Sequence, residues 1–343
     1  MYKKFFMGIA AMAALTLESC SSDDLNSFSD NSSKNEAISF DGYLGRSAVA
    51  VNGSRGSVET KDQLKTDGFG VFGKYTPTEG QASNLFDNQK VTYSTSTTPT
   101  ESKWTYENTK YWPTEGHIDF LAYAPYVGET TLKNNKSIDF TVEGEVAKQK
   151  DLLWANAANK KKADNPVKFT FNHALAKIGY TVKLKEAYSN ATITLNKITL
   201  AGSADGKTSA FYTSGTIDLS KTSSTDLWTT LSSDAKQNFN WFSGTQKLDG
   251  TYNTPETNYL FVIPQNFSAP ATDELYVIVE YTIKYSGGSE TVTTTNIVNK
   301  KLEKNFEQGK AYTINLTIGL TPIDFDADVT AWADGGKEDI TWN

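Results

Sequence analysis

The chain has 343 residues, of which 38% are apolar and 21% are charged, so it is long enough for one or two packed domains. Its 33 basic and 40 acidic residues give a net charge of −7, without the basic stripe on which nucleic-acid binding depends. The single cysteine, Cys20, excludes an internal disulfide framework and Cys-rich zinc sites. With only two histidines as well, we expect no bound metal, no cofactor and no enzymatic activity.

The first twenty residues are typical of an export signal. Lys3 and Lys4 precede an apolar stretch at residues 5–17, which is too short to span a bilayer. Residues 17–20 (LESC) resemble the lipobox of bacterial lipoproteins, in which the cysteine thiol receives a diacylglycerol. We therefore predict a signal peptide at residues 1–19 and a lipidated Cys20. The alternative is ordinary secretion with an incidental cysteine.

Residues 20–36 are rich in Ser, Asp and Asn and contain too few apolar side chains to bury a core. We expect a flexible, lipid-anchored tether there. Asp23 and Asp24 resemble the acidic signal that sends some lipoproteins to the outer face of the outer membrane. The alternative is that they only begin a solvated tether.

From residue 37 the sequence consists of short alternating segments separated by Gly, Pro, Asn, Asp, Ser and Thr. About seven strands are predicted in the first part, which suits one small sandwich at residues 37–165. These strands are predicted at residues 38–43, 69–75, 90–93, 103–106, 118–123, 137–142 and 152–155.

The polar segment 156–166 (NAANKKKADNP) has no apolar face, which indicates a linker before a second domain at residues 166–343. The strands expected in this domain are residues 167–171, 178–184, 193–200, 216–219, 259–264, 275–285, 292–298, 312–320 and 323–332.

Alternation is clearest at residues 275–283 and 312–320, where every second side chain is apolar. A break in parity between Leu195 and Ile198 suggests a β-bulge. No helix of twelve or more residues is predicted, although residues 174–177 and 226–232 are compatible with single turns. The fold class is therefore all-β, as two antiparallel β-sandwiches in tandem.

Several short motifs follow the lipobox in a recognisable order. They are Ile38-Ser39-Phe40, Ser54-Arg55-Gly56, Phe69-Gly70-Val71-Phe72, the aromatic run from Lys103-Trp104 to Trp112-Pro113, Ile118 to Tyr123, Asp151 to Trp154, Phe171 to Ile178, and Gly309 to Leu316. In this order and spacing the sequence resembles the fimbrillin family, the subunits of type V pili and their relatives. The resemblance covers nearly the whole chain.

The resemblance implies two transthyretin-like β-sandwich domains, export as a lipoprotein and no enzymatic activity. It also implies that an arginine-specific protease cuts the loop after the first strand. That cut would release the strand, with Ile38 and Phe40, together with the lipid. The vacated groove would then accept a strand from a neighbouring subunit, which is β-augmentation of an exposed sheet edge.

The only two arginines of the chain, Arg46 and Arg55, both follow the predicted first strand. An arginine-specific protease would therefore cut only there and leave both domains whole. Arg55 matches the turn arginine of the family, whereas Arg46 is better placed to free the first strand alone. The alternative is that the two arginines cluster by chance.

The C-terminal segment from residue 323 is a candidate donor strand, because Ile323, Phe325 and Val329 alternate along it. Between them Asp324, Asp326 and Asp328 would line one face of a strand. These carboxylates fit either a calcium site or a charged face that discourages unwanted edge pairing.

The histidines are not expected to be catalytic. His173 lies in an apolar stretch and is predicted to be packed and hydrogen-bonded, while His117 is predicted at the surface. The aromatic cluster has two interpretations, as sandwich core or as a platform for sugar rings. Its members are Trp104, Tyr106, Tyr111 and Trp112.

The sequence thus favours a cell-surface fimbrial subunit, or a tip or anchor adhesin, located at the outer membrane and in the fimbrium. The expected partners are other fimbrial subunits, an arginine-specific protease and the membrane, through the lipid on Cys20. The alternative function is an outer-membrane lipoprotein that binds glycans as a nutrient-capture accessory.

Overall fold

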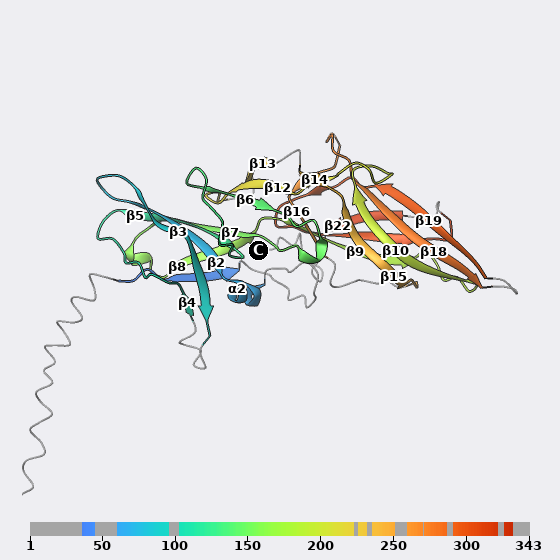
Figure 1. Cartoon of the computed structure of the whole chain (residues 1–343), viewed down its shortest axis with the longest axis horizontal. Coiled ribbons are helices and arrows are strands. Elements are labelled where there is room, and N and C mark those ends of the chain that lie inside the picture. The colour runs from blue at the N-terminus through green and yellow to red at the C-terminus, as the bar shows by residue number, and fades with distance from the viewer. Residues whose placement is uncertain are drawn as a thin grey trace, which may run out of the picture.

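The computed structural model describes residues 36–44, 60–95, 103–222, 226–231, 235–250, 259–269, 271–286, 291–321 and 326–331. In these residues the chain is an all-β protein, as the sequence predicts. Figure 1 shows the first strands gathered at one end of the long axis and β9, β10, β15, β18 and β19 at the other. Strands β6, β12 and β13 lie between them.

Residues 36–173 form one helix, two 3₁₀ turns and the first eight strands. They are β1 (Phe40–Leu44), α2 (Lys61–Asp67), β2 (Phe69–Thr76), β3 (Ser83–Ser94), β4 (Lys103–Thr105), β5 (His117–Ala124), β6 (Ser137–Thr141), η2 (Val146–Lys148), β7 (Leu153–Lys160), η3 (Lys162–Asp164) and β8 (Val167–His173).

The rest of the described chain is strand and connection. The strands are β9 (Ala176–Leu184), β10 (Ala191–Ala201), β11 (Phe211–Tyr212), β12 (Ser214–Asp218), β13 (Trp228–Leu231), β14 (Lys236–Gln237), β15 (Phe239–Lys247), β16 (Leu260–Val262), β17 (Gln265–Asn266), β18 (Tyr276–Ser286), β19 (Thr291–Lys301), β20 (Asn305–Phe306), β21 (Ala311–Ile318) and β22 (Asp326–Ala331).

Seven of these strands form the first sheet, in the order β1-β8-β7-β5-β2-β3-β4. The sequence placed β8 in the second domain, but β8 pairs with β1 and β7. Its Phe169 and Phe171 pack against the side chains of the other strands of this first sheet. The predicted boundary between residues 165 and 166 therefore cuts through this sheet. The polar residues 156–160 that suggested a linker continue β7, and η3 turns the chain back into β8.

Two hydrophobic clusters lie on the two faces of the first sheet. One cluster consists of side chains selected from the range Ile38 to Phe171 and includes Leu64 of α2. The other contains Phe72, Leu121 and Tyr123 from the opposite face, packed together with side chains of β6 and of the strands from β9 onward. The first sheet thus connects the two cores.

The later strands form two four-stranded sheets, β15-β10-β18-β19 and β16-β9-β21-β22, together with smaller pairings. The predicted alternation is confirmed, because Val277, Val279, Tyr281 and Ile283 are buried along β18. The predicted bulge is also confirmed, as a register shift between Leu195 and Lys197. Two pairings, β1 with β8 and β9 with β21, are parallel rather than antiparallel.

The two predicted single turns are wrong. Residues 228–231 form β13, and residues 176–177 begin β9. Helix α2 and strand β15 were not predicted. Helix α2 has a local signal, because the Thr60 hydroxyl accepts a hydrogen bond from the Gln63 backbone N–H at 3.1 Å and Gly68 ends the helix with a φ of 69°.

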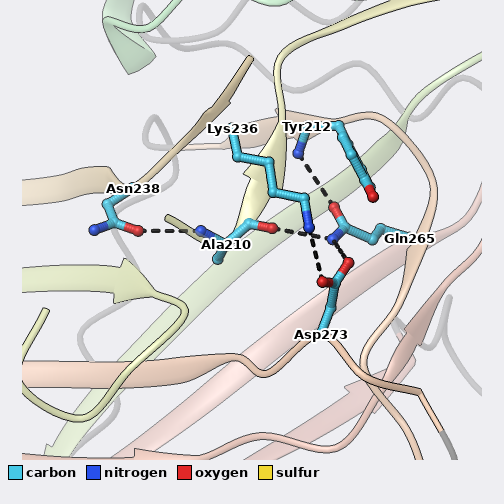
Figure 2. Close-up of polar contacts among 6 residues, drawn as sticks. All are labelled: Ala210, Tyr212, Lys236, Asn238, Gln265 and Asp273. Carbon is cyan, nitrogen blue, oxygen red and sulfur yellow. Dashed lines mark hydrogen bonds and ion pairs between the residues drawn. The ribbon is translucent and has the colours of Figure 1, made fainter. Parts of the chain in front are cut away.

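A polar network joins β11, β14 and β17 to the segment before β18 (Figure 2). Lys236 Nζ lies 2.7 Å from Asp273 Oδ1, and Gln265 Nε2 donates to Asp273 Oδ2 at 2.9 Å and to the Ala210 carbonyl at 3.0 Å. Burial alone lowers the pKa of Lys236, but the hydrogen bond and the charge of Asp273 outweigh it and raise the pKa. The network fixes short strands that have few ladder hydrogen bonds of their own.

Candidate functional site

The first strand occupies a groove at the margin of the first sheet. β1 is the terminal strand of that sheet and pairs in parallel with β8, with Phe40 opposite Val167 and Leu44 opposite Phe171. Figure 1 shows β1 in blue beside β8, near α2. Because side chains alternate along a strand, Phe40, Gly42 and Leu44 face the core, while Tyr43 is 43% exposed.

Phe40 is enclosed by aromatic rings from four other parts of the chain. Its ring centroid lies 5.4 Å from Phe86, 5.4 Å from Tyr106, 5.6 Å from Phe120 and 5.8 Å from Phe169. Edge-to-face and tilted contacts of this kind add to the burial of each ring. Phe40 is 4% exposed, so removal of β1 would leave an aromatic-lined groove.

Gly42 allows β1 to lie close to the next layer of rings. A Cβ atom at this position would be 3.2 Å from Phe69 Cε1, 3.4 Å from Trp104 Cζ2 and 3.5 Å from Phe171 Cε2. Glycine therefore suits this position for reasons of space. It also means that β1 contributes backbone rather than side chain to the middle of the groove.

The residues before β1 are held on their other side by the segment around Trp112. Ile38, which is 1% exposed, donates its backbone N–H to the Lys110 carbonyl at 2.8 Å. Trp112 donates its backbone N–H to the Glu36 carbonyl at 2.9 Å. The Tyr106 hydroxyl donates to the Ile38 carbonyl at 2.7 Å, and burial raises the pKa of Tyr106, which keeps the hydroxyl protonated.

Asn165 forms a second clamp, from within the segment that the sequence suggested was a linker. Its Oδ1 accepts hydrogen bonds from the Ser39 backbone N–H at 2.9 Å and from Ser39 Oγ at 3.0 Å. Its Nδ2 donates to Glu36 Oε1 at 2.7 Å and to the Ala37 carbonyl at 3.1 Å. Sequence reasoning missed this role; the available signal was the Asn-Pro turn just before β8.

The structure therefore places the predicted Ile38 and Phe40 together in one groove. The other predicted site residues of the N-terminal part, Cys20, Arg46 and Arg55, lie outside the described residues. The sequence nevertheless fixes one relation between them. Both arginines lie in residues 45–59, which connect β1 to the segment that enters α2.

The C-terminal candidate strand is described only in part. β22 pairs antiparallel with β21, and Val329 packs partly buried against the larger core. Ile323, Asp324 and Phe325 lie outside the described residues. Asp326 forms an ion pair with Lys300, whose hydrogen bond lowers the pKa of that carboxyl. Within the described ranges, no group of three potential metal ligands occurs.

The aromatic cluster divides between core and surface. Trp104 is 8% exposed and Trp112 is 4% exposed, so both indoles belong to the core. Tyr106 packs against that core, and only Tyr111 is exposed. The interpretation as a core is confirmed for the two tryptophans, which cannot form a shared platform for a sugar ring.

His173 is packed and hydrogen-bonded, as predicted. It is buried, with Nδ1 2.5 Å from Asp151 Oδ2. The neighbouring Lys177 is also buried, with Nζ 3.7 Å from the centre of the Tyr259 ring, and burial lowers its pKa to about 7. These groups lie where the chain passes from β8 to β9, and their contacts are with core elements.

In the part of the chain that the structure describes, no helix is long and apolar enough to cross a membrane.

Comparison with known proteins gives a consistent result. The family described as fimbrillin-like matches residues 57–332. A fimbrial protein from Bacteroides vulgatus has a similar structure, with a TM-score of 0.63, 21% identity, and coverage of 86% of this chain and 98% of that chain. A putative cell adhesion protein from Bacteroides uniformis has a TM-score of 0.52, 16% identity, and coverage of 90% and 98%. No curated protein sequence matches this chain.

Proposed function

Because the chain belongs to the fimbrillin-like family, we propose that it is a subunit of a cell-surface fimbria and assembles by exchange of its first strand. In this proposal β1 is a temporary occupant of its groove. Cleavage after Arg46 or Arg55 frees β1 together with the lipid on Cys20, and a strand of a neighbouring subunit takes its place. The role is structural and adhesive.

The observation that carries the proposal is the way in which β1 is held. It is a terminal strand, so it can leave without breaking any other pairing of the sheet. Ile38 and Phe40 nevertheless fill the groove with buried apolar side chains. A replacement strand with apolar residues at alternate positions would restore both the ladder to β8 and the filling of the groove.

The candidate donor is the segment from residue 323 to the C-terminus, with Ile323, Phe325 and Val329 at alternate positions. For β22 to act in this way it must first leave β21, which it pairs over residues 326–331. β22 is also a terminal strand, so this step breaks a single ladder. A chain ending before Ile323 that still polymerises after cleavage would contradict the assignment of the donor.

Membrane attachment through Cys20 precedes cleavage in this proposal. Three acyl chains anchor a protein far more strongly than one, at about 0.8 kcal/mol per buried methylene group. Labelling of cells with a palmitate analogue tests this step. We expect label on the intact chain, none on a Cys20→Ser variant, and none on the cleaved subunit.

The cleavage step is tested with the full chain and an arginine-specific protease. We expect a single cut after one of the two arginines and a ladder of polymers that resists detergent. The variants Arg46→Lys and Arg55→Lys keep the charge but remove one candidate bond each, so they identify the bond that is cut. The double variant should remain uncut and should form no ladder of polymers.

The result that would contradict the proposal comes from assembled surface material. N-terminal sequencing of that material should begin at residue 47 or 56. Polymers whose N-terminus is still the lipidated Cys20, or polymers of the uncut double variant, would show that release of β1 is not required.

A further inference from the structure

β19 is a long sheet edge with an unused row of backbone groups. It pairs with β18 over all eleven residues, Thr291–Lys301, without a register shift. Within the described residues nothing pairs with its other side, since it ends the order β15-β10-β18-β19. In Figure 1 it runs alongside β18 at the end of the molecule away from β1.

The direction of its backbone groups follows from two hydrogen bonds. The Ser286 N–H donates to the Asn190 carbonyl at 2.8 Å, so the backbone N–H and C=O groups of even-numbered residues of β18 point toward β10. The Leu302 N–H donates to the Leu275 carbonyl at 2.8 Å, so the backbone N–H and C=O groups of odd-numbered residues of β18 point toward β19. Because pairing partners on β18 and β19 have opposite parity, the even residues of β19 bond to β18. Its odd residues, from Thr291 to Lys301, direct their N–H and C=O groups outward.

Four other terminal strands, β4, β15, β16 and β22, carry features that discourage edge pairing. β4 and β16 have only three residues each. β15 has two register shifts along its pairing with β10. β22 carries Asp326 and Asp328, both exposed. β19 has neither a short length, nor a bulge, nor a proline, nor a carboxylate.

The only charges on β19 are Lys300 and Lys301, and each forms a solvent-exposed ion pair within the chain. Lys300 forms an ion pair with Asp326, and Lys301 Nζ lies 2.7 Å from Glu274 Oε1. The strand also exposes apolar side chains, because Ile297 is 66% and Val292 is 54% exposed. A long edge of this kind, rich in Thr, Val and Ile, is the type that pairs with another strand.

We propose that β19 is a lateral contact between two copies of this chain, which pair antiparallel through their β19 edges about a twofold axis at Asn296. This is the register that uses all eleven residues. It brings the outward-facing Thr295 opposite Ile297 of the other copy, and Thr293 opposite Asn299. Two-fold symmetry makes the same edge serve on both copies.

A second copy fits this edge because its β19 matches it over the full eleven residues, and the distribution of charge sets the antiparallel orientation. Both lysines lie at the same end of the strand. Antiparallel pairing in full register separates the two lysine pairs by roughly 30 Å, at about 3.4 Å per residue. Parallel pairing would place them side by side. The contact does not depend on strand exchange, because β1 lies in the other core.

The first test places one cysteine on the axis. In a full chain carrying Cys20→Ser, Asn296→Cys brings two thiols across a pair that is not hydrogen-bonded, where Cα atoms are about 4.5 Å apart, within reach of a disulfide. We expect a disulfide-linked dimer under mild oxidation. Thr291→Cys is the matched control, because its symmetry mate lies at the far end of the strand, and it should remain monomeric.

The second test removes an outward donor without touching the ladder to β18. Thr295→Pro deletes one outward N–H, whereas Thr295→Ser keeps it. In sedimentation of the full chain we expect the Ser variant to form dimers like the parent and the Pro variant to stay monomeric, with unchanged circular dichroism. A folded Asn296→Cys chain that forms no disulfide, equal cross-linking of both cysteine variants, or a dimer that survives Thr295→Pro would overturn the proposal.

Discussion

Truncation of Phe40 is the most direct measurement of how firmly the groove holds β1. Phe40→Ala removes the ring that packs against Phe86, Tyr106, Phe120 and Phe169. Three of the surrounding rings belong to β3, β5 and β8, and the fourth to the segment after β4. The positions of the three strands are fixed by their pairing in the first sheet. The rings cannot collapse fully into the space, so the variant should retain a cavity.

The expected loss of unfolding free energy combines the lost burial of the ring with the cavity that remains. Burial of a phenylalanine side chain is worth about 1.5–3 kcal/mol. With the cavity that remains, Phe→Ala in a packed core costs about 3–5 kcal/mol, and we expect the upper part of this range. In the cleaved chain the same loss acts on release of β1. It should raise the equilibrium constant for release by about two to nearly four orders of magnitude, since 1.4 kcal/mol is about tenfold.

The assay is urea unfolding of the uncleaved chain, with Tyr43→Ala as the matched control. Tyr43 lies on the same strand but is 43% exposed, so its truncation should cost less than about 1 kcal/mol. After cleavage, the N-terminal fragment of the Phe40→Ala chain should separate during gel filtration, and that of Tyr43→Ala should not. Equal losses of stability for the two variants would show that the ring cage does not hold β1.

Three further predictions concern polar groups that are buried or half-buried. Burial lowers the pKa of Lys177 to about 7 from 10.5, so from pH 7 upward the unfolded chain binds a proton that the folded chain lacks. Unfolding free energy should therefore rise by about 2 kcal/mol between about pH 7 and 9, and Lys177→Met should abolish the rise in urea titrations. Asn165→Ala removes four contacts to the segment before β1 and should lower unfolding free energy by about 1–3 kcal/mol, while increasing fragment release after cleavage. Asp273→Asn should lower the melting temperature at neutral pH and lose this effect once the pH exceeds the raised pKa of Lys236, because the ion pair stabilises the fold until that lysine deprotonates.

Local sequence pattern predicted most strands because their burial is regular. Along β18 and β21 the alternating apolar side chains of the sequence are the buried ones of the structure. The packing of His173 and of the two tryptophans could also be predicted, since large side chains in apolar strands are usually buried.

The pairing of distant strands could not be predicted in this way. The parallel ladder between β1 and β8 joins residues more than 120 positions apart, and no local pattern specifies it. The same separation hid the role of Asn165, whose polar segment resembles a linker unless its partners at residues 36–39 are known. Strand β15 was missed because its apolar side chains are confined to its first four residues and its register is interrupted.

The structure also bears on why cleavage would be needed for exchange. While residues 45–59 connect β1 to the rest of the chain, β1 returns to its groove as an intramolecular reaction. A short tether gives an effective concentration in the millimolar range, so a free strand of equal affinity competes only when its own concentration is comparable. Weak filling of the groove would not remove this advantage, because the tether acts independently of the contacts of Phe40 and Asn165. A cut in the connection removes it without changing any contact in the groove. In the proposed mechanism the groove can therefore hold β1 tightly before cleavage and still accept a neighbour's strand afterwards, when that strand is supplied at high local concentration by the growing fimbria.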